Sequence, residues 1–319
     1  MLQPLNYAMG EEFRMDINKK AYAAAIAYAT IVGFTYLGTK TCLGITTPLL
    51  TLSWRYDMGC AAALLLIAFG FVRFSFKGRD VRGLFLAASF YLGFMGIQAL
   101  GLTMATSIEG GIVFAVVPIF VQIIAYFMLK EKTVFVQNIS ILVTVFGIIL
   151  LYVWGSAGFG KINPIGFLLL LLSSLSMGFS NVFMRYVRKD FKAPEVGCFI
   201  AIFGCIVFNL LGFIIAESKG IFSFHYYISP FTSGSGHTFL LAVLYLGIPC
   251  MLLTSSLITY ALSHLEAVKG TVFGNLSLLI SIIAGIAIRQ EPFMIYHLVC
   301  TILIVMGVIG TNIPGMKKS

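Results

Sequence analysis

The stretch that decides the fold is residues 105–132, which read ATSIEGGIVFAVVPIFVQIIAYFMLKEK. Its apolar part, 107–128, is long enough to cross the roughly 30 Å of hydrocarbon in a bilayer. It is expected to be helical, because lipid offers the backbone no other hydrogen-bond partner. Pro118 lies in the middle and removes one backbone hydrogen bond, so it predicts a kink at that level. The segment therefore predicts a bent membrane-spanning helix that ends near Glu131.

The rest of the chain has the same apolar character. Of its 319 residues, 59% are hydrophobic and 10% are charged, and the mean hydropathy is +0.99. A soluble domain usually carries about 45–50% apolar and about 25% charged residues. So few charges cannot build a water-facing surface, which excludes a soluble protein, a disordered chain and a collagen. Ten spans of about 20 residues would occupy roughly 200 positions and leave no room for a separate soluble enzyme domain.

Ten apolar segments of suitable length follow one another, so the predicted fold class is an all-α membrane protein with ten transmembrane helices. Most connections are short. The longest, about 217–237, contains SFHYYISPF and then TSGSG, which suit a membrane–water interface and a flexible turn. The predicted spans are 21–39, 48–72, 83–102, 107–128, 136–154, 164–184, 195–216, 238–260, 268–288 and 294–313.

The positive charges predict the orientation. If the ten spans alternate in direction, 16 lysines and arginines fall on one side of the membrane and four on the other, with Arg55 inside a span. Cytoplasmic loops are enriched in these residues, so the tails 1–19 and 314–319 are both expected in the cytoplasm. These loops, rather than a nucleic-acid partner, explain the net charge of +9. No cleavable signal peptide is visible. A start of translation at Met15 is a hypothesis, because this residue comes just before the first apolar run.

The chain repeats itself weakly. At an offset of 145, GFTYLGTK (33–40) lies over GFSNVFMR (178–185), and at an offset of 160 the segment from Gly110 lies over the segment from Gly270. The second register places Glu131 over Glu291. The 217–237 connection absorbs the difference between the offsets. Each repeat, 20–155 and 164–313, holds five spans, and because five is odd the second is expected to be inverted, as in many carriers.

These features resemble the drug/metabolite transporter (DMT) superfamily, specifically the bacterial EamA-type permeases. The resemblance rests on the polar end of the first span (GFTYLGTKTCLG), the early arginine in LSWRYDMG, the 105–132 run and its counterpart YALSHLEAVKGTVFGNLSLLISIIAGIAIRQEP. It covers nearly the whole chain after residue 20. It implies a 5+5 inverted fold in a bacterial inner membrane and secondary transport of small metabolites, often amino acids. A homodimer is compatible with it, and no sequence feature decides that point.

Two ionisable residues inside the second span are candidates for function, because charges in hydrocarbon are costly. Arg55 lies roughly 10 Å into the span at 1.5 Å per residue, and it is interpreted as the group that binds a substrate carboxylate. Asp57 is a candidate proton carrier. The two cannot pair directly, because positions i and i+2 face different sides of a helix. The alternative interpretation is that both are shielded groups near the interface.

Further candidates line the inner faces of other spans. Tyr36 and Lys40 share a face of the first span, and Asn181 and Arg185 share the equivalent face of the sixth. Lys40 is expected to draw anionic groups to the outer mouth, whereas Arg185 merges into a positive cluster. Pro118 is assigned to a kink or gate. The remaining predicted substrate contacts are Tyr91, Gln98, Phe114, Tyr260 and Asn275.

Several absences narrow the function. No Walker A sequence is present, so ATP hydrolysis is not expected. The four histidines are scattered and the six cysteines form no C-x-x-C pair, so neither a metal nor another cofactor is expected. Two alternatives stay open. One is efflux of lipophilic cations or drugs, which would call for a carboxylate in the first span. The other is a non-transporting membrane protein. An integral membrane enzyme would need an interfacial cluster of His, Asp or Glu, which the sequence lacks.

Overall fold

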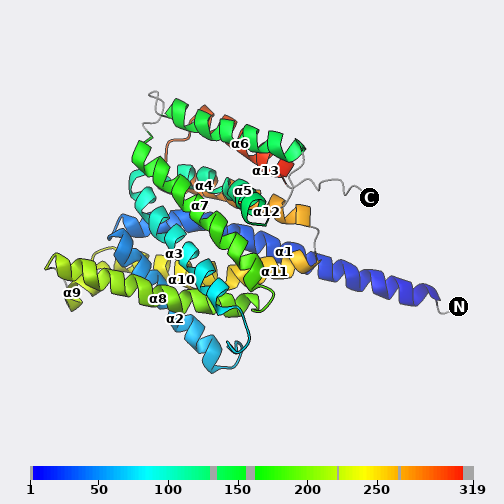
Figure 1. Ribbon diagram of the computed structural model, residues 1–319, viewed down its shortest axis with the longest axis horizontal. Coiled ribbons are helices and arrows are strands. Elements are labelled where there is room, and N and C mark those ends of the chain that lie inside the picture. Colours follow the sequence, from blue (N-terminus) through cyan, green and yellow to red (C-terminus); the bar gives the residue numbers. More distant parts are fainter. Residues whose placement is uncertain (1–2, 130–134, 156–161, 221–222, 265–266, 312–319) are drawn as a thin grey trace.

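The computed structural model describes residues 3–129, 135–155, 162–220, 223–264 and 267–311, and these contain no strand. They form a bundle of helices (Figure 1). The first part of the chain contributes α1 (Gln3–Leu43), α2 (Pro48–Ala68), α3 (Val81–Met104), α4 (Ser107–Phe114), α5 (Val117–Leu129) and α6 (Phe135–Trp154). The second part contributes α7 (Pro164–Val187), α8 (Ala193–Ser218), α9 (Phe224–Thr232), α10 (Gly236–Gly247), α11 (Thr254–His264), α12 (Ala267–Arg289) and α13 (Ile295–Thr311).

Within the described residues, seven helical segments are long and apolar enough to cross a membrane. They are Lys19–Leu43, Val81–Met104, Ser107–Met128, Phe135–Trp154, Pro164–Val187, Ala193–Ser218 and Gly236–Ile258. Three helices occupy the other predicted spans. The two ionisable side chains of α2, Arg55 and Asp57, lower its hydropathy, and α12 and α13 contribute shorter apolar stretches. A multi-pass membrane protein is therefore confirmed, and the number ten stays a prediction.

Side-chain caps set where several helices begin. The Thr47 hydroxyl accepts a hydrogen bond from the Leu50 amide ahead of Pro48, the first residue of α2. The Asn163 side chain accepts hydrogen bonds from two amides of α7, which also begins with a proline. Proline has no N–H to leave unsatisfied and its fixed φ fits the first helical turn. These local signals explain why the connections can be short.

Two of the predicted spans are broken. The 107–128 segment forms α4 and α5, which are separated at Ala115 and Val116, and Pro118 lies in the first turn of α5. The prolyl ring therefore sits where its missing N–H matters least. The predicted 238–260 span is interrupted by a π-helical turn over Pro249–Leu253, between α10 and α11. Both breaks lie in segments that line the central cavity described below.

Equivalent helices of the two halves make equivalent packing contacts. Here α1 corresponds to α7, α2 to α8, α3 to α10 and α11, the α4–α5 pair to α12, and α6 to α13. The packing of α3 on α7 then matches that of α1 on α10 and α11, and the packing of α1 on α12 matches that of α7 on α4 and α5. The α2–α8 and α6–α13 pairs map onto themselves. The contacts therefore support a two-repeat architecture.

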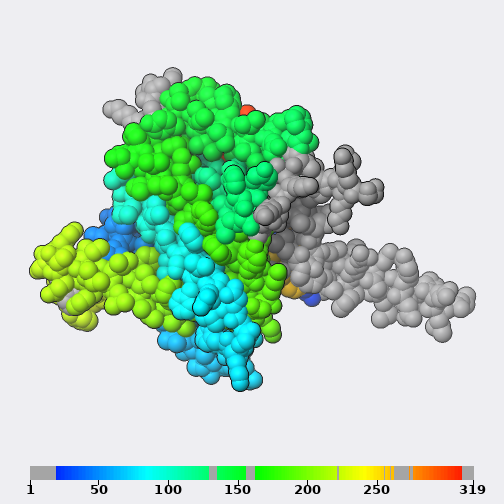
Figure 2. All heavy atoms as spheres, in the orientation of Figure 1, coloured from blue at the N-terminus to red at the C-terminus, as the bar shows by residue number. Residues whose placement is uncertain are grey.

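The outer surface of the bundle is apolar. In Figure 2 the outer sides of α6, α7 and α8 form much of the visible face. Large apolar side chains are exposed there, including Leu142 and Phe146 on α6 and Leu210 and Ile214 on α8. A water-soluble monomer rarely exposes apolar patches of this extent, so these faces fit contact with lipid.

Two buried apolar clusters meet in the middle of the bundle. One joins α2, α3 and α8 and includes Tyr56, Leu92 and Phe208. The other joins α3, α4, α6, α7 and α13 and includes Leu102 and Ile304. Phe114, at the end of α4, packs against both clusters. The clusters hold the helices that surround the cavity.

Candidate functional site

A central cavity of about 210 Å³ lies between the two halves of the chain. Its wall is built by α1, α2, α3 and α4 from the first half and by α7, α8, the π-helical turn and α11 from the second half. Six of the residues predicted to contact substrate line it: Tyr36, Arg55, Tyr91, Gln98, Phe114 and Asn181. The structure therefore brings together residues that lie on five separate helices.

Arg55 is the buried charged group in the wall of this cavity. Its side chain is 1% exposed, and its Nε has no hydrogen-bond partner. Nowhere in the described part of the chain does a carboxylate form an ion pair with it. Burial of an unpaired charge is costly, so such groups usually have a partner or bind a ligand. The guanidinium is therefore placed to bind a planar anion such as a carboxylate.

Aromatic side chains surround the cavity on the first-half side. Gln98, 3% exposed, donates a hydrogen bond from Nε2 to the Tyr36 hydroxyl at 3.1 Å. The ring of Phe114 lies edge-on to Tyr36 with centroids 6.0 Å apart, and it contacts Phe94 at 5.6 Å. Tyr91 packs edge-on against Phe94 at 5.8 Å. This wall presents aromatic rings together with the amide of Gln98 and the hydroxyl groups of its tyrosines.

The two offsets found in the sequence pair residues across the cavity. Each partner in these pairs lines the same space, although the two come from different halves. At the offset of 145 the pairs are Val32 with Met177, Thr35 with Ser180, Tyr36 with Asn181, and Arg55 with Ile200; at the offset of 160 they are Tyr91 with Met251, Phe94 with Thr254, and Gln98 with Ile258. The weak sequence repeat therefore corresponds to equivalent positions around the cavity.

The cavity extends to Arg188, an exposed residue at the end of α7. Arg188 was not among the predicted site residues, because it lies in a run of positive charges, where an orienting role is the simpler explanation. Tyr28, which lines the cavity on α1, was not predicted either. Tyr28, Val32 and Thr35 recur at the spacing of one helix face. That spacing, continued from Tyr36, is the signal that could have found Tyr28.

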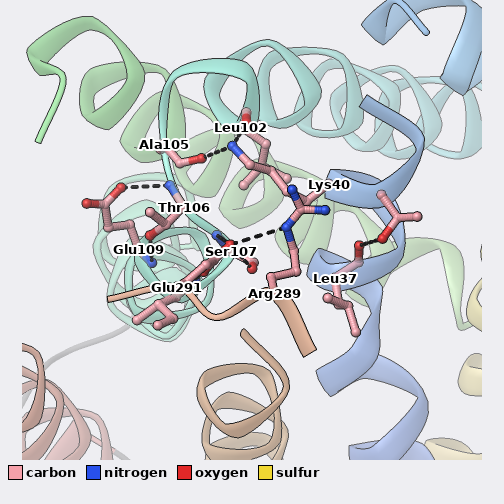
Figure 3. A network of polar contacts seen from close by, with 11 residues as sticks. Leu37, Lys40, Leu102, Ala105, Thr106, Ser107, Glu109, Arg289 and Glu291 are labelled. Carbon is pink, nitrogen blue, oxygen red and sulfur yellow. Dashed lines mark hydrogen bonds and ion pairs between the residues drawn. The ribbon is translucent and has the colours of Figure 1, made fainter. Parts of the chain in front are cut away.

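Lys40 has a different environment from the one predicted. It is not among the lining residues of the cavity. Figure 3 shows its ammonium group at the turn between α3 and α4. There Nζ donates hydrogen bonds to the backbone carbonyl oxygen of Leu102 at 2.5 Å and to that of Ala105. Carbonyls at a helix C-terminus have no partner within the helix, and a cation there is favourable. Lys40 thus fixes the end of α3.

Glu291 fixes the other side of the same turn (Figure 3). Its carboxylate accepts hydrogen bonds from the Ser107 amide at 3.1 Å, the Ser107 hydroxyl at 2.6 Å and the Ile108 amide at 3.1 Å. Arg289 Nε lies 3.7 Å from the carboxylate. Glu291 lies two residues after Arg289, the last residue of α12. The structure shows that it joins the α12–α13 connection to the N-terminus of α4.

The backbone places Glu291 at this position. Gln290 has φ of 52°, the one non-glycine residue with positive φ in the described ranges. This left-handed conformation ends α12, and the Glu291 amide donates back to the Gly285 oxygen at 3.1 Å. Glu109 caps the same N-terminus of α4 differently, since its carboxylate and the Thr106 hydroxyl form a reciprocal capping box within one turn. Lys40 and Glu291 together form what we term the turn clamp.

Asp57 lies outside the cavity. Its Oδ1 accepts hydrogen bonds from Asn209 Nδ2 at 2.6 Å and Cys205 Sγ at 3.2 Å, and its Oδ2 accepts one from the Tyr227 hydroxyl. The indole nitrogen of Trp54 donates a hydrogen bond to the backbone carbonyl oxygen of Tyr227 at 2.9 Å. Asp57 therefore anchors α9 and α8 to α2, on a face of α2 other than the one with Arg55.

The other predicted residues lie apart from the cavity. Tyr260 is on α11 but 40% exposed, and it is not a lining residue. The side chain of Asn275 lies outside the described residues. Pro118 marks the break between α4 and α5. Among the residues that could be searched, no group of three or more His, Cys, Asp or Glu side chains could hold a metal ion.

Comparison with known proteins gives a consistent picture. The model of the EamA-like transporter family matches residues 19–153 and 164–313. The uncharacterized transporter YcxC of Bacillus subtilis (strain 168) is 34% identical over 300 residues, which cover 94% of this chain and 95% of YcxC. YyaM, an uncharacterized transporter of the same strain, is 20% identical over 302 residues, covering 91% and 93%. One crystal structure shares the fold, with a TM-score of 0.59 and 18% identity over 92% of this chain and 96% of that one.

Proposed function

The chain belongs to the EamA-like transporter family of the DMT type, and from this membership and the cavity we propose that it is a secondary carrier for small polar metabolites that bear a carboxylate. Amino acids are the first class to test. The carrier would export or exchange them by exposing the central cavity to each side of the membrane in turn. The observation that carries the proposal is the buried, unpaired Arg55 in the cavity wall.

The charge of the cavity favours an anionic group. Arg55 lies in its wall and Arg188 at its exposed end, and no carboxylate is among the lining residues that the structure describes. A lipophilic cation would meet two arginines and no counter-charge, which disfavours the alternative of cation efflux. A carboxylate would pair with the Arg55 guanidinium in a setting from which water is largely excluded.

The size of the cavity favours a small substrate. Its volume of about 210 Å³ is below the range of about 300–1,000 Å³ that is usual for pockets of drug-sized ligands. The aromatic wall and the amide of Gln98 offer contacts to the remainder of a small molecule. A small metabolite therefore fits the site better than a bulky drug.

The arrangement of the halves supports alternating access. Equivalent positions of both repeats line the cavity, so a relative movement of the halves would change its opening without dismantling either repeat. The cavity extends to the exposed Arg188, whereas the α3–α4 turn is held by the turn clamp. We take this arrangement as a state of the proposed carrier that is open towards Arg188 and closed at the clamp. The opposite state would require release of the clamp.

Counterflow into proteoliposomes tests the proposal. Purified protein is reconstituted with an unlabelled amino-acid mixture inside, and the accumulation of labelled amino acids is measured. We expect accumulation with the wild type and at least a tenfold loss of initial rate with Arg55→Gln, since the charge-assisted hydrogen bonds are lost. Arg73→Gln, which removes the same charge from the exposed α2–α3 connection, should leave the rate unchanged.

Two results would contradict the proposal. Unchanged counterflow by folded Arg55→Gln would remove Arg55 from the binding site. No accumulation of any amino acid by folded wild-type protein would remove amino acids as the substrate class, and carboxylates without an amino group would be tested next.

A further inference from the structure

The two halves contribute chemically different walls to the cavity. All lining aromatic residues come from the first half, and they are Tyr28, Tyr36, Tyr91, Phe94 and Phe114. The large lining side chains of the second half are methionines and aliphatic residues, apart from Asn181 and the exposed Arg188. They are Met177, Met184, Val196, Ile200, Met251 and Ile258. The site is therefore symmetric in position and asymmetric in chemistry.

The difference is sharpest at equivalent positions. Arg55 of the first half corresponds to Ile200, and Gln98 corresponds to Ile258. Tyr91 corresponds to Met251. At each of these places a polar or charged side chain faces the cavity from one half and an apolar side chain faces it from the other. A ligand that spans the cavity would thus meet a polar wall and an apolar wall.

Small polar groups of the second half are already engaged by the backbone. The Ser180 hydroxyl donates to the Ala87 oxygen at 2.8 Å, and the Thr254 hydroxyl donates to the Cys250 oxygen at 2.9 Å. Neither hydroxyl therefore has a hydrogen to offer a ligand. A polar group of a substrate that reaches the wall of Met177, Ile200, Met251 and Ile258 would find few partners. We call these four residues the apolar wall.

We infer that the preferred substrates are amino acids with an apolar aliphatic or thioether side chain, such as leucine, isoleucine and methionine, and that the apolar wall selects them. The inference rests on the proposed function and specifies its substrate. The carboxylate binds Arg55, and the ammonium group lies against the aromatic faces of the first half, whose negative π-systems attract cations. The side chain points to the apolar wall.

Physical chemistry sets the expected selectivity. Each buried methylene favours binding by about fourfold, from the transfer free energy of a methylene group. A polar side chain of equal size loses its hydrogen bonds with water and gains none at this wall, which weakens its binding by about tenfold or more. Methionine side chains adapt their shape, so the wall should accept several apolar side chains rather than a single one.

The test is competition within pairs of equal size. Counterflow of labelled leucine is measured while unlabelled competitors are added in pairs: leucine with asparagine, methionine with glutamine, and valine with threonine. We expect the apolar member of each pair to inhibit at a concentration at least tenfold lower than its polar partner. Equal inhibition within the pairs, in a protein that does accumulate amino acids, would overturn the inference while leaving the proposed function intact.

A substitution in the second half tests whether the apolar wall is the source of this selectivity. Ile258→Gln places at this position the residue that its equivalent, Gln98, already has. We expect it to reduce the preference for methionine over glutamine by at least fivefold, whereas Ile258→Leu, which keeps the wall apolar, should leave it unchanged. If Ile258→Gln does not fold, Met251→Gln replaces it with the same expectation. An unchanged ratio in the folded Gln variant would overturn the role of the apolar wall. Failure of the wild type to transport any amino acid would overturn the proposed function together with this inference.

Discussion

At the scale of single residues, the unpaired charge of Arg55 distinguishes the cavity from the rest of the bundle. The polar groups of Asp57, Glu109 and Glu291 all have hydrogen-bond partners within the protein. Arg55 has none among the described residues, although its side chain is almost fully buried. A buried cation without a partner destabilises the fold. In the proposed carrier, the carboxylate of the substrate would supply the missing counter-charge.

The direction of a side chain on its own helix could be predicted from the sequence, because it follows from the 3.6-residue period. Arg55 and Asp57 are two positions apart, which predicted that they face different directions, and they do. The partners of Asp57 could not be predicted, because Asn209 and Tyr227 lie on other helices more than a hundred residues away. The capping role of Lys40 was hidden for the same reason. Spacing along one helix does not show which backbone carbonyls of another helix lie nearby.

Asp57→Asn should lower stability without changing the pH dependence of transport. An amide offers one acceptor oxygen where the carboxylate offers two, so the hydrogen bonds that hold α8 and α9 are weakened, at a cost of about 1.5–3 kcal/mol. Burial and the Asp57 carboxylate raise the pKa of the Tyr227 hydroxyl, so this donor stays protonated across the neutral range and adds no pH dependence. Thermal unfolding in detergent and counterflow between pH 5.5 and 8.5 measure the two effects. A variant with unchanged thermal stability and a flattened pH profile would make Asp57 the proton carrier.

At the scale of elements, the structure differs from a bundle of continuous membrane helices in its two broken spans and in the turn clamp. The α4–α5 break lies two residues before Pro118, near the level where the sequence predicts a kink. The π-helical turn over Pro249–Leu253 was not anticipated, although Pro249 removes a backbone hydrogen bond within its apolar run just as Pro118 does in its own. Apolar length predicts that a segment crosses the membrane. It does not predict where the hydrogen-bond pattern changes within it.

The proposal that the turn clamp closes one end of the cavity leads to a prediction. Glu291→Gln removes the ion pair with Arg289 and replaces one acceptor oxygen by an amide nitrogen that cannot accept from α4. Loss of hydrogen bonds to a charged group corresponds to roughly tenfold in an equilibrium, so the α3–α4 turn should separate from α12 more often. A cysteine at Thr35, which lines the cavity, should then react about tenfold faster with an impermeant thiol reagent added on the Lys40 side of the membrane.

Glu109→Gln is the matched control for this measurement. It changes a carboxylate at the same helix end, but that carboxylate belongs to a capping box within one turn, where glutamine is also found. In the Thr35→Cys background, Glu109→Gln should leave the rate of cysteine labelling unchanged. Equal acceleration by both variants would show that any loosening of α4 exposes the cavity and that the clamp has no special part in closing it.

At the scale of the whole molecule, each half is expected to cross the membrane five times, and this predicts on which side each half ends. Alkaline phosphatase fused after Asn163 should be active in a bacterial host, because an odd number of spans carries it out of the cytoplasm. Fused after residue 319 it should be inactive, whereas green fluorescent protein at the same position should fluoresce. Phosphatase activity at neither or both positions would contradict the inverted arrangement of the halves.

The symmetry of the molecule is incomplete, and α9 is one of the places where it fails. This helix lies between α8 and α10 and is held to α2 by Trp54 and Asp57, whereas the equivalent connection between α2 and α3, residues 69–80, contains no helix. In the proposed alternating-access carrier, the inward-facing and outward-facing conformers would therefore differ in energy, and the substrate should show a different KM on the two faces. Detailed balance nevertheless requires that an uncoupled carrier have the same ratio of maximal rate to KM in both directions. In this carrier α9 would set the substrate concentration at which transport saturates on each side of the membrane. The direction of net flow would still be decided by the substrate gradient.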